Sequence, residues 1–277
     1  MNAALADAVA PLTRQTLAAW AVLAIDVETD PGDGQRIFQI GAVRSDDGRA
    51  LGLATSRLGI AEVVRRVDAL AQGARVLVGH NLRRHDLPQL RLQYPELRLL
   101  ALPVIDTLEL SAIAFPTNPY HRLVKGYKLL SDCRNNPTKD ARLALDLLGD
   151  EVDALRAMHA ADPRWLALLH ALLAPDAALD RLLRGIRQAS APGRADAQRL
   201  ALARFTPLCC SARLAQLSAP EAADDAGQRQ ALAYALGWVR VAGGNSVLPA
   251  WVHHELPAVR GCVTALRERD CGQAGCA

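Results

Sequence analysis

The sequence predicts an α/β domain with a mixed sheet flanked by helices, followed by a mainly helical region. Three observations support this fold class. Short apolar strands alternate with turns near the N-terminus, helices and strands alternate after them, and leucine and alanine recur at helical spacing in the second half. We place the boundary so that residues 1–165 form the α/β domain and residues 166–277 form a helical accessory or connector region.

The first part of the chain predicts an antiparallel meander of three strands. Apolar runs at residues 22–25, 36–43 and 51–58 have the length and composition of strands. Turn-forming residues at 31–34 and 45–48 separate them, and such short connections join antiparallel neighbours.

Helices and strands alternate in the next part, and helices alone follow. The expected elements are a helix at 61–71, a strand at 76–79, a helix at 86–94, a strand at 104–107 and a helix at 140–148. In the second half we expect helices at 196–216 and 225–240, preceded by a linker at 190–194.

The composition excludes several classes of protein. The chain has 277 residues and a net charge of +3, which is too small to indicate nucleic-acid binding by itself. No apolar run is long enough to span a membrane, so we expect no membrane partner. The N-terminus lacks the basic start and apolar core of a secretory signal. We therefore expect a cytoplasmic protein with reduced cysteines.

Two carboxylates mark the end of the first strand. Asp26 and Glu28 are two residues apart, so both project from the same face of a strand. They repel each other unless a cation lies between them, and Mg²⁺ and Mn²⁺ prefer such oxygen ligands. Thr29 completes an Asp-Val-Glu-Thr motif, which is much rarer at a strand end than the acidic pair alone.

Two further carboxylates follow at the starts of expected helices. Asp86 comes after a buried strand and Gly79-His80-Asn81, and Asp140 precedes Ala141-Arg142. Asp146 is an alternative to Asp140, but six residues turn a helix by about 240°, so we do not expect both to face one site. We choose Asp140 because it lies at the helix start.

With these motifs in this order, the chain resembles the DnaQ-like (DEDD) exonuclease superfamily, which has a ribonuclease H-like fold, over roughly residues 20–150. The resemblance implies a 3′→5′ exonuclease that acts on the 3′ end of DNA, in single-stranded form. It implies two Mg²⁺ or Mn²⁺ ions, roughly 3.5–4 Å apart, held by Asp26, Glu28, Asp86 and Asp140. It also implies that Thr29, His80 and Asn81 contact the terminal nucleotide.

The chain departs from the family at the general base. The family has a histidine five residues before the last aspartate, or a tyrosine four before it, and this chain has Asn135 and Asn136. An amide cannot take a proton from water, so Asn135 could orient the nucleophile without activating it. General base catalysis contributes about 10²–10⁴-fold, so the departure predicts a slow enzyme. His121 or His85 could substitute, or the reaction could use no protein base.

Other features widen the range of partners. Cys271 and Cys276 could supply half of a zinc site, completed by Cys262, His253 or His254, or they could be free thiols. Residues 115–129 resemble the DnaQ-like domains that are joined to RecQ-type helicases, which favours DNA over RNA and suggests a helicase domain as partner. The alternative function is a catalytically weakened module that binds nucleic-acid ends within such an assembly.

Overall fold

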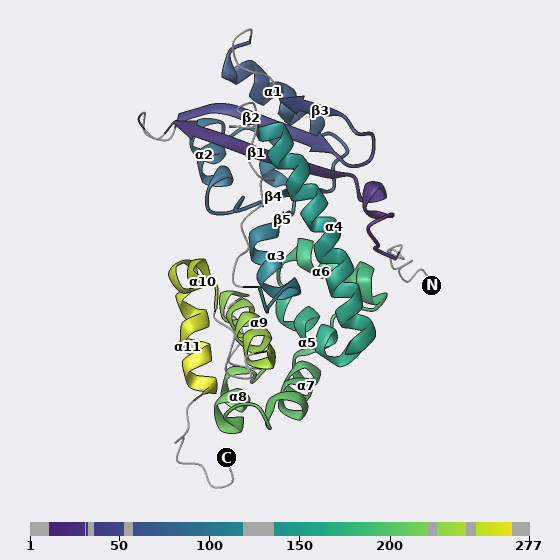
Figure 1. Cartoon of the computed structure of the whole chain (residues 1–277), viewed down its shortest axis with the longest axis vertical. Coiled ribbons are helices and arrows are strands. Elements are labelled where there is room, and N and C mark those ends of the chain that lie inside the picture. The colour runs from purple at the N-terminus through teal and green to yellow at the C-terminus, as the bar shows by residue number, and fades with distance from the viewer. Residues whose placement is uncertain are drawn as a thin grey trace, which may run out of the picture. The chain divides into compact units, whose positions relative to one another are not determined.

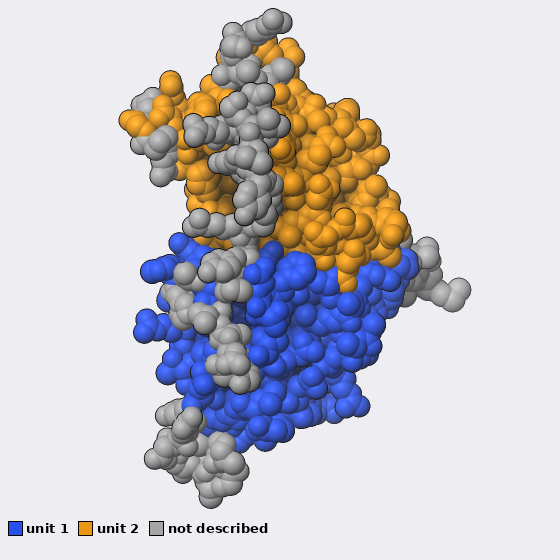
Figure 2. Space-filling view, viewed as in Figure 1, with its two compact units in different colours: residues 1–12, 111–121, 154–277 blue, residues 13–110, 122–153 orange. Residues whose placement is uncertain are grey.

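The protein was analysed as a computed structural model, which describes residues 11–30, 32, 36–52, 58–118, 136–220, 226–241 and 248–267. The chain forms two compact units, coloured separately in Figure 2. The sheet unit consists of residues 13–110 and 122–153, and the helical unit of residues 1–12, 111–121 and 154–277. The units therefore change at residue 153, whereas the boundary that we placed at residue 165 lies inside a helix.

The sheet unit contains a five-stranded mixed sheet, and the predicted α/β class is confirmed. The strands are β1 Val22–Asp30, β2 Arg36–Arg44, β3 Ala50–Gly52, β4 Val76–Gly79 and β5 Val104–Asp106, in the spatial order β3-β2-β1-β4-β5 (Figure 1). The first three strands pair antiparallel, as the meander prediction requires, and β4 and β5 run parallel to β1. The predicted third strand extended to residue 58, and residues 53–57 lie outside the described ranges.

Alternation along β1 assigns its side chains to two faces of the sheet. Leu23, Ile25 and Val27 are buried in the core, where they join Val63 and Val67 of helix α1. The helices that supply this core are α1 Ile60–Leu70 and α2 Asp86–Gln93. Each such side chain contributes about 1.5–3 kcal/mol on burial. Because the period of a strand is two, Asp26 and Glu28 lie on the opposite face.

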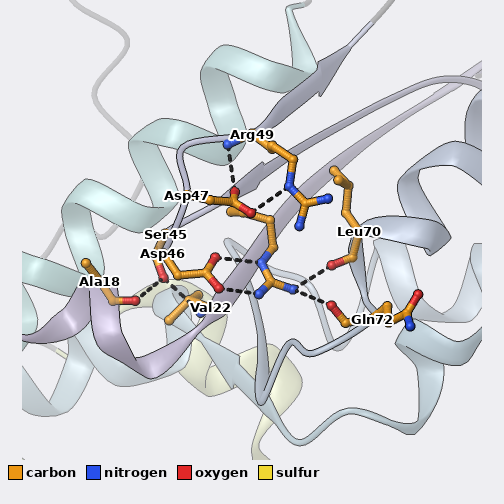
Figure 3. A network of polar contacts seen from close by, with 9 residues as sticks. Ala18, Val22, Ser45, Asp46, Asp47, Arg49, Leu70 and Gln72 are labelled. Carbon is orange, nitrogen blue, oxygen red and sulfur yellow. Dashed lines mark hydrogen bonds and ion pairs between the residues drawn. The ribbon is translucent and has the colours of Figure 1, made fainter.

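Arg44 at the end of β2 ties the sheet to the C-terminal end of α1 (Figure 3). Its guanidinium is 3% exposed, donates to the carbonyls of Leu70 at 2.7 Å and Gln72 at 3.0 Å, and forms two hydrogen bonds with the Asp46 carboxylate. The last carbonyls of a helix have no partner inside the helix, so this arginine satisfies them. The ion pair raises the pKa of Arg44 and lowers the pKa of Asp46.

Helix α4 Pro137–Ala161 is longer than the predicted helix and belongs to both units. The shorter elements of this part of the chain are the 3₁₀ turns η1 Leu17–Trp20 and η2 Arg98–Ala101 and helix α3 Thr107–Ala114. In Figure 1 the N-terminal end of α4 lies over β1 and β2. α4 therefore covers the sheet face that carries the acidic pair.

The helical unit buries an aromatic pair, Trp165 and Phe205, with ring centroids 5.4 Å apart. Its helices are α5 Pro163–Leu173, α6 Ala177–Arg187, α7 Arg194–Phe205, α8 Ser211–Leu217, α9 Ala226–Val241, α10 Ala250–Glu255 and α11 Pro257–Leu266. The single helix expected over residues 196–216 is two helices, α7 and α8. No described helix combines the length and apolar character that crossing a bilayer requires.

Candidate metal centre

Three of the predicted metal ligands come together in the sheet unit. Asp26, Glu28 and Asp140 each place one carboxylate oxygen so that the three atoms lie within 4.8 Å of one another. Asp26 and Glu28 are half-buried, and Asp140 is 6% exposed. Three carboxylates at this distance repel one another strongly, so the arrangement is most favourable when a cation is bound. The donor set consists of oxygen atoms only, which suits Mg²⁺ or Mn²⁺.

A pair of glycines allows α4 to approach the sheet closely enough to deliver Asp140. Asp26 pairs with Gly41 on β2, and Gly41 pairs with Gly52 on β3, so the three positions form a row on one face. A Cβ at Gly41 would lie 2.1 Å from the backbone nitrogen of Thr138. A Cβ at Gly52 would overlap the Thr138 hydroxyl, which itself donates to the Leu51 carbonyl at 3.2 Å. Only glycine fits at either position.

The start of α4 fixes where Asp140 lies along the helix. Asn136 precedes Pro137, and its side-chain oxygen accepts a hydrogen bond from the Lys139 backbone N–H at 3.2 Å. Asn136 therefore acts as the N-cap, with proline in the first helical position that it favours. Asp140 lies in the first turn, where the helix dipole favours a negative charge. Asp146, the alternative considered from the sequence, is exposed and lies outside the carboxylate group.

Asp86 approaches the same strand from its other edge. The pairing of β1 with β4 ends at Ala24, so the Val27 N–H has no strand partner there, and the Asp86 carboxylate accepts it at 2.7 Å. Asp86 is 3% exposed, and burial raises its pKa. The imidazole of His85 lies 3.7 Å from the second Asp86 oxygen, and this contact raises the pKa of His85. Asp86 is thus anchored beside the Asp26–Glu28 pair without joining the close group.

The loop that leads to Asp86 is held by Asp106 at the end of β5. The Asp106 carboxylate is 2% exposed and accepts backbone N–H bonds from Asn81, Arg83 and Leu108, each 2.9–3.0 Å long. Asn81 has a φ of 65°, a left-handed conformation that asparagine tolerates. These bonds fix the loop between β4 and α2, and hence the position of Asp86.

His80 and two arginines of this loop contact the start of α3. The Thr107 hydroxyl donates to the Gly79 carbonyl at 3.2 Å and lies 3.0 Å from His80 Nδ1. Since a hydroxyl has one proton, His80 Nδ1 is the donor in the second bond. Arg83 and Arg84 pair with Glu109, which is 7% exposed, at 3.4 and 2.9 Å.

The remaining predicted site residues are placed only in part. The register between β1 and β2 shifts between Glu28 and Thr29. The direction of the Thr29 side chain is therefore determined by this bulge and not by the regular alternation of the strand. His121, Asn135, Cys271 and Cys276 lie outside the described residues, so the predicted base and zinc site stay predictions. Of the residues proposed to complete zinc, Cys262 is buried in α11, and burial raises its thiol pKa.

Sequence reasoning missed the residues that position the carboxylates. The missed residues are Gly41, Gly52, Asp106, Thr107 and Glu109. One signal was present: Asp106 follows a short apolar run in its strand, as Asp26 does, but two of its three partners are backbone N–H groups of a loop that is distant in the sequence. The two glycines carried no signal, because an isolated glycine in a strand does not reveal which segment approaches it.

No protein-family model matches this chain, and no curated protein or solved structure shows significant similarity to it. The resemblance to DnaQ-like exonucleases therefore rests on the sequence motifs, and the structure contributes the carboxylate geometry.

Proposed function

We propose that the sheet unit is a metal-dependent 3′→5′ exonuclease with a ribonuclease H-like fold. The observation that carries this proposal is the convergence of Asp26, Glu28 and Asp140 on one point, with Asp86 fixed beside them. The strand order supports it, since an antiparallel meander followed by two parallel strands is compatible with the fold that the resemblance implies.

The proposed chemistry assigns separate tasks to the residues. Bound Mg²⁺ or Mn²⁺ ions would lower the pKa of the attacking water and stabilise the leaving 3′-oxygen. Asp26, Glu28 and Asp140 would hold the ions from the sheet face and from α4. Asp86 would complete the site from the other edge of β1, because its bond to the Val27 N–H fixes one oxygen and leaves the second near His85. Thr29, His80 and Asn81 would border the terminal nucleotide.

Asn136 stands where some family members have a tyrosine, and its amide is used to cap α4. It is therefore assigned to helix initiation and not to proton transfer. His121 and His85 are the candidate bases, and a reaction without a protein base is the alternative. Replacing each histidine with alanine distinguishes these cases, because only a base role predicts a change in the pH profile of cleavage.

The second candidate function is a weakened module that binds nucleic-acid ends within a helicase assembly. The observation that favours it is Asn135 in place of the family histidine. Both candidates use the same carboxylate site, and cleavage separates them.

Digestion of 5′-labelled single-stranded DNA and RNA in Mg²⁺, Mn²⁺ or EDTA tests the proposal. A ladder of products that requires metal and is abolished by Asp26→Asn and by Asp140→Asn supports the enzyme. The matched control is Asp146→Asn, on the same helix but exposed and outside the carboxylate group, which should cleave like the wild type. Binding without cleavage in either metal would support the second candidate. The RNA arm decides between the two substrates.

A further inference from the structure

The helical unit carries an open groove whose charge is opposite to that of the metal centre. The groove has a volume of about 970 Å³ and lies along α8 and α11. Its lining contains five polar residues and Gly261. The polar residues are Arg213, Gln216, Arg260, Thr264 and Arg267. Among the described residues of the lining, none is acidic.

Helical spacing explains how these side chains share one face. Val259, Cys262 and Leu266 of α11 are buried, so Arg260 and Thr264, four residues apart, point away from the core. Arg260 and Arg267 are seven residues apart, which is about 10 Å along a helix. On α8, Arg213 and Gln216 face the groove while Leu214 is buried. The arginines therefore lie along the groove and not at a single point.

The excess of positive charge extends to the helices behind the groove. α11 packs on both α8 and α9, and the sequences of these three helices contain four arginines and no aspartate or glutamate. Across the whole chain, by contrast, 32 basic residues nearly balance 29 acidic ones. The charged residues of these three helices are therefore all basic, although Arg240 lies 3.8 Å from Asp162 and the neighbouring helix α10 carries Glu255.

We propose that this groove binds the phosphate backbone of a single-stranded nucleic acid. The choice of ligand rests on the exonuclease function proposed above. Arginine and amide donors in a lining whose described residues include no carboxylate fit a polyanion, and open basic grooves that follow the backbone are typical of single-strand binding. The guanidinium carbon of Arg267 lies 5.1 Å from the centroid of the Trp238 ring, so a cation–π contact restrains one of the guanidinium groups that line the groove.

The groove fits an acidic protein segment less well. Protein interfaces depend on large apolar or aromatic residues that are buried in pockets. The apolar side chains of the lining, Leu217, Pro257 and Ala265, are small or isolated. Charge is therefore the dominant property of the groove, and a ligand with regularly spaced negative charges matches it best.

Gly261 offers a test that removes none of the arginines. A Cβ at Gly261 meets nothing within 4 Å, and glutamate has a higher helix propensity than glycine, so Gly261→Glu should fold. The new carboxylate would stand between Arg260 and Thr264 and repel phosphate. Gly193→Glu is the matched control, because Gly193 also has open space for a Cβ and lies outside the groove.

Binding of the full chain to fluorescein-labelled oligothymidylate is measured by anisotropy, in EDTA and over a range of KCl concentrations. Gly261→Glu should weaken binding on the order of tenfold at low salt. Arg260→Gln should reduce the slope of log affinity against log salt by about 0.7, the value for one phosphate contact with a single strand. Gly193→Glu should bind like the wild type.

Unchanged affinity and salt slope in both groove variants would overturn the proposal, as would wild-type protein that does not bind. So would groove variants that lose binding to polyglutamate but keep binding to the oligonucleotide. Cleavage of a dinucleotide in Mn²⁺, measured in parallel, separates the two proposals. If the groove variants bind weakly and the wild-type chain cleaves no dinucleotide, the groove proposal is supported and the exonuclease proposal is contradicted. If the chain cleaves the dinucleotide and both groove variants bind the oligonucleotide normally, the exonuclease proposal is supported and the groove proposal is contradicted.

Discussion

The candidate metal centre of the sheet unit and the basic groove of the helical unit are built in opposite ways. The metal centre depends on close packing: two glycines admit α4, and Asp140 is 6% exposed where it meets Asp26 and Glu28. The groove consists of exposed side chains on two helices, with open space above Gly261. Opposite charges in one chain largely cancel in the net value, so a net charge of +3 describes neither region.

The largest expected difference concerns glycine in the two regions. In Gly41→Ala, the new methyl group would collide with the Thr138 backbone and displace Asp140. A misplacement of about 1 Å near the chemistry can cost about 10²-fold in rate, and overpacking costs about 1–3 kcal/mol of stability. Gly261→Ala should leave cleavage unchanged and stabilise α11 by about 0.5–1 kcal/mol. Cleavage rates and thermal unfolding check both, and full activity in Gly41→Ala would show that α4 is not held in this way.

Arginine offers the next comparison. Arg44→Met should lower the free energy of unfolding by about 2–4 kcal/mol, because it leaves Asp46, the last carbonyl of α1 and the Gln72 carbonyl without their buried partner. Arg260→Gln, at an exposed position, should change it by less than about 0.5 kcal/mol. Urea unfolding measures both changes. Equal effects would mean that the Arg44 network contributes no more than a surface residue.

Divalent cations should stabilise one region and not the other. At 100 times its dissociation constant, Mn²⁺ should add about 2.7 kcal/mol to the free energy of unfolding. Hydrogen exchange should slow in β1 and in the first turn of α4 and stay unchanged in α8 and α11. Asp140→Asn should abolish the effect and Asp146→Asn should retain it. Protection of α8 and α11 would place the ion elsewhere.

The smallest expected effect is a pH dependence of opposite sign in the two units. Burial raises the pKa of Asp86, so in metal-free protein its contribution is favourable at acidic pH and is lost as the pH rises through the folded-state value. Burial lowers the pKa of His170 in α5, so its contribution is present above its usual pKa of 6.5 and is lost as the pH falls. Unfolding at several pH values in EDTA should become flatter with Asp86→Asn at the acidic end and with His170→Gln near neutrality.

Burial and the nearby Arg187 lower the pKa of His170, whereas its hydrogen bond to Asp180 raises this pKa. Its Nδ1 accepts from Arg187 at 2.6 Å, so its Nε2 carries the proton and donates to Asp180 at 2.9 Å. A second proton would break the bond to Arg187. A pH profile that is identical in His170→Gln and in the wild type would contradict this assignment.

Sequence patterns predicted the sheet because strands and turns have local signals. The apolar run that begins β1 and the turn residues after the strand depend only on neighbours along the chain, and they predicted the three-stranded meander. The places of β4 and β5 on the other side of β1 were not predicted. The N-terminal sequence also predicts an amphipathic helix over residues 3–19, and this prediction is wrong over residues 11–19, where the chain forms a turn followed by η1. Leu12, Leu17 and Trp20 are buried there, and a spacing of five and then three residues is not that of one helix face.

The candidate site was predictable in its carboxylates and not in its supports. Asp26, Glu28 and Asp140 could be chosen because acidic residues at element ends have a chemical meaning of their own. The roles of Asp106 and Gly52 become evident only when a loop or a helix packs against them, and the residues that do so, Asn81 and Arg83 in the loop and Thr138 in the helix, are distant along the chain. Tertiary approach of this kind leaves no local pattern.

The chain path through the two units has a consequence for any attempt to divide the protein. The chain leaves the sheet unit at residue 110, enters the helical unit, returns at residue 122 and leaves again at residue 153, within α4. No single cut therefore separates the two. A fragment that ends at residue 165 would keep Asp140. It would, however, leave residues 111–118 and the C-terminal turns of α4 without the remainder of the helical unit against which they pack. Transferring the candidate metal centre to another protein would therefore require the whole chain.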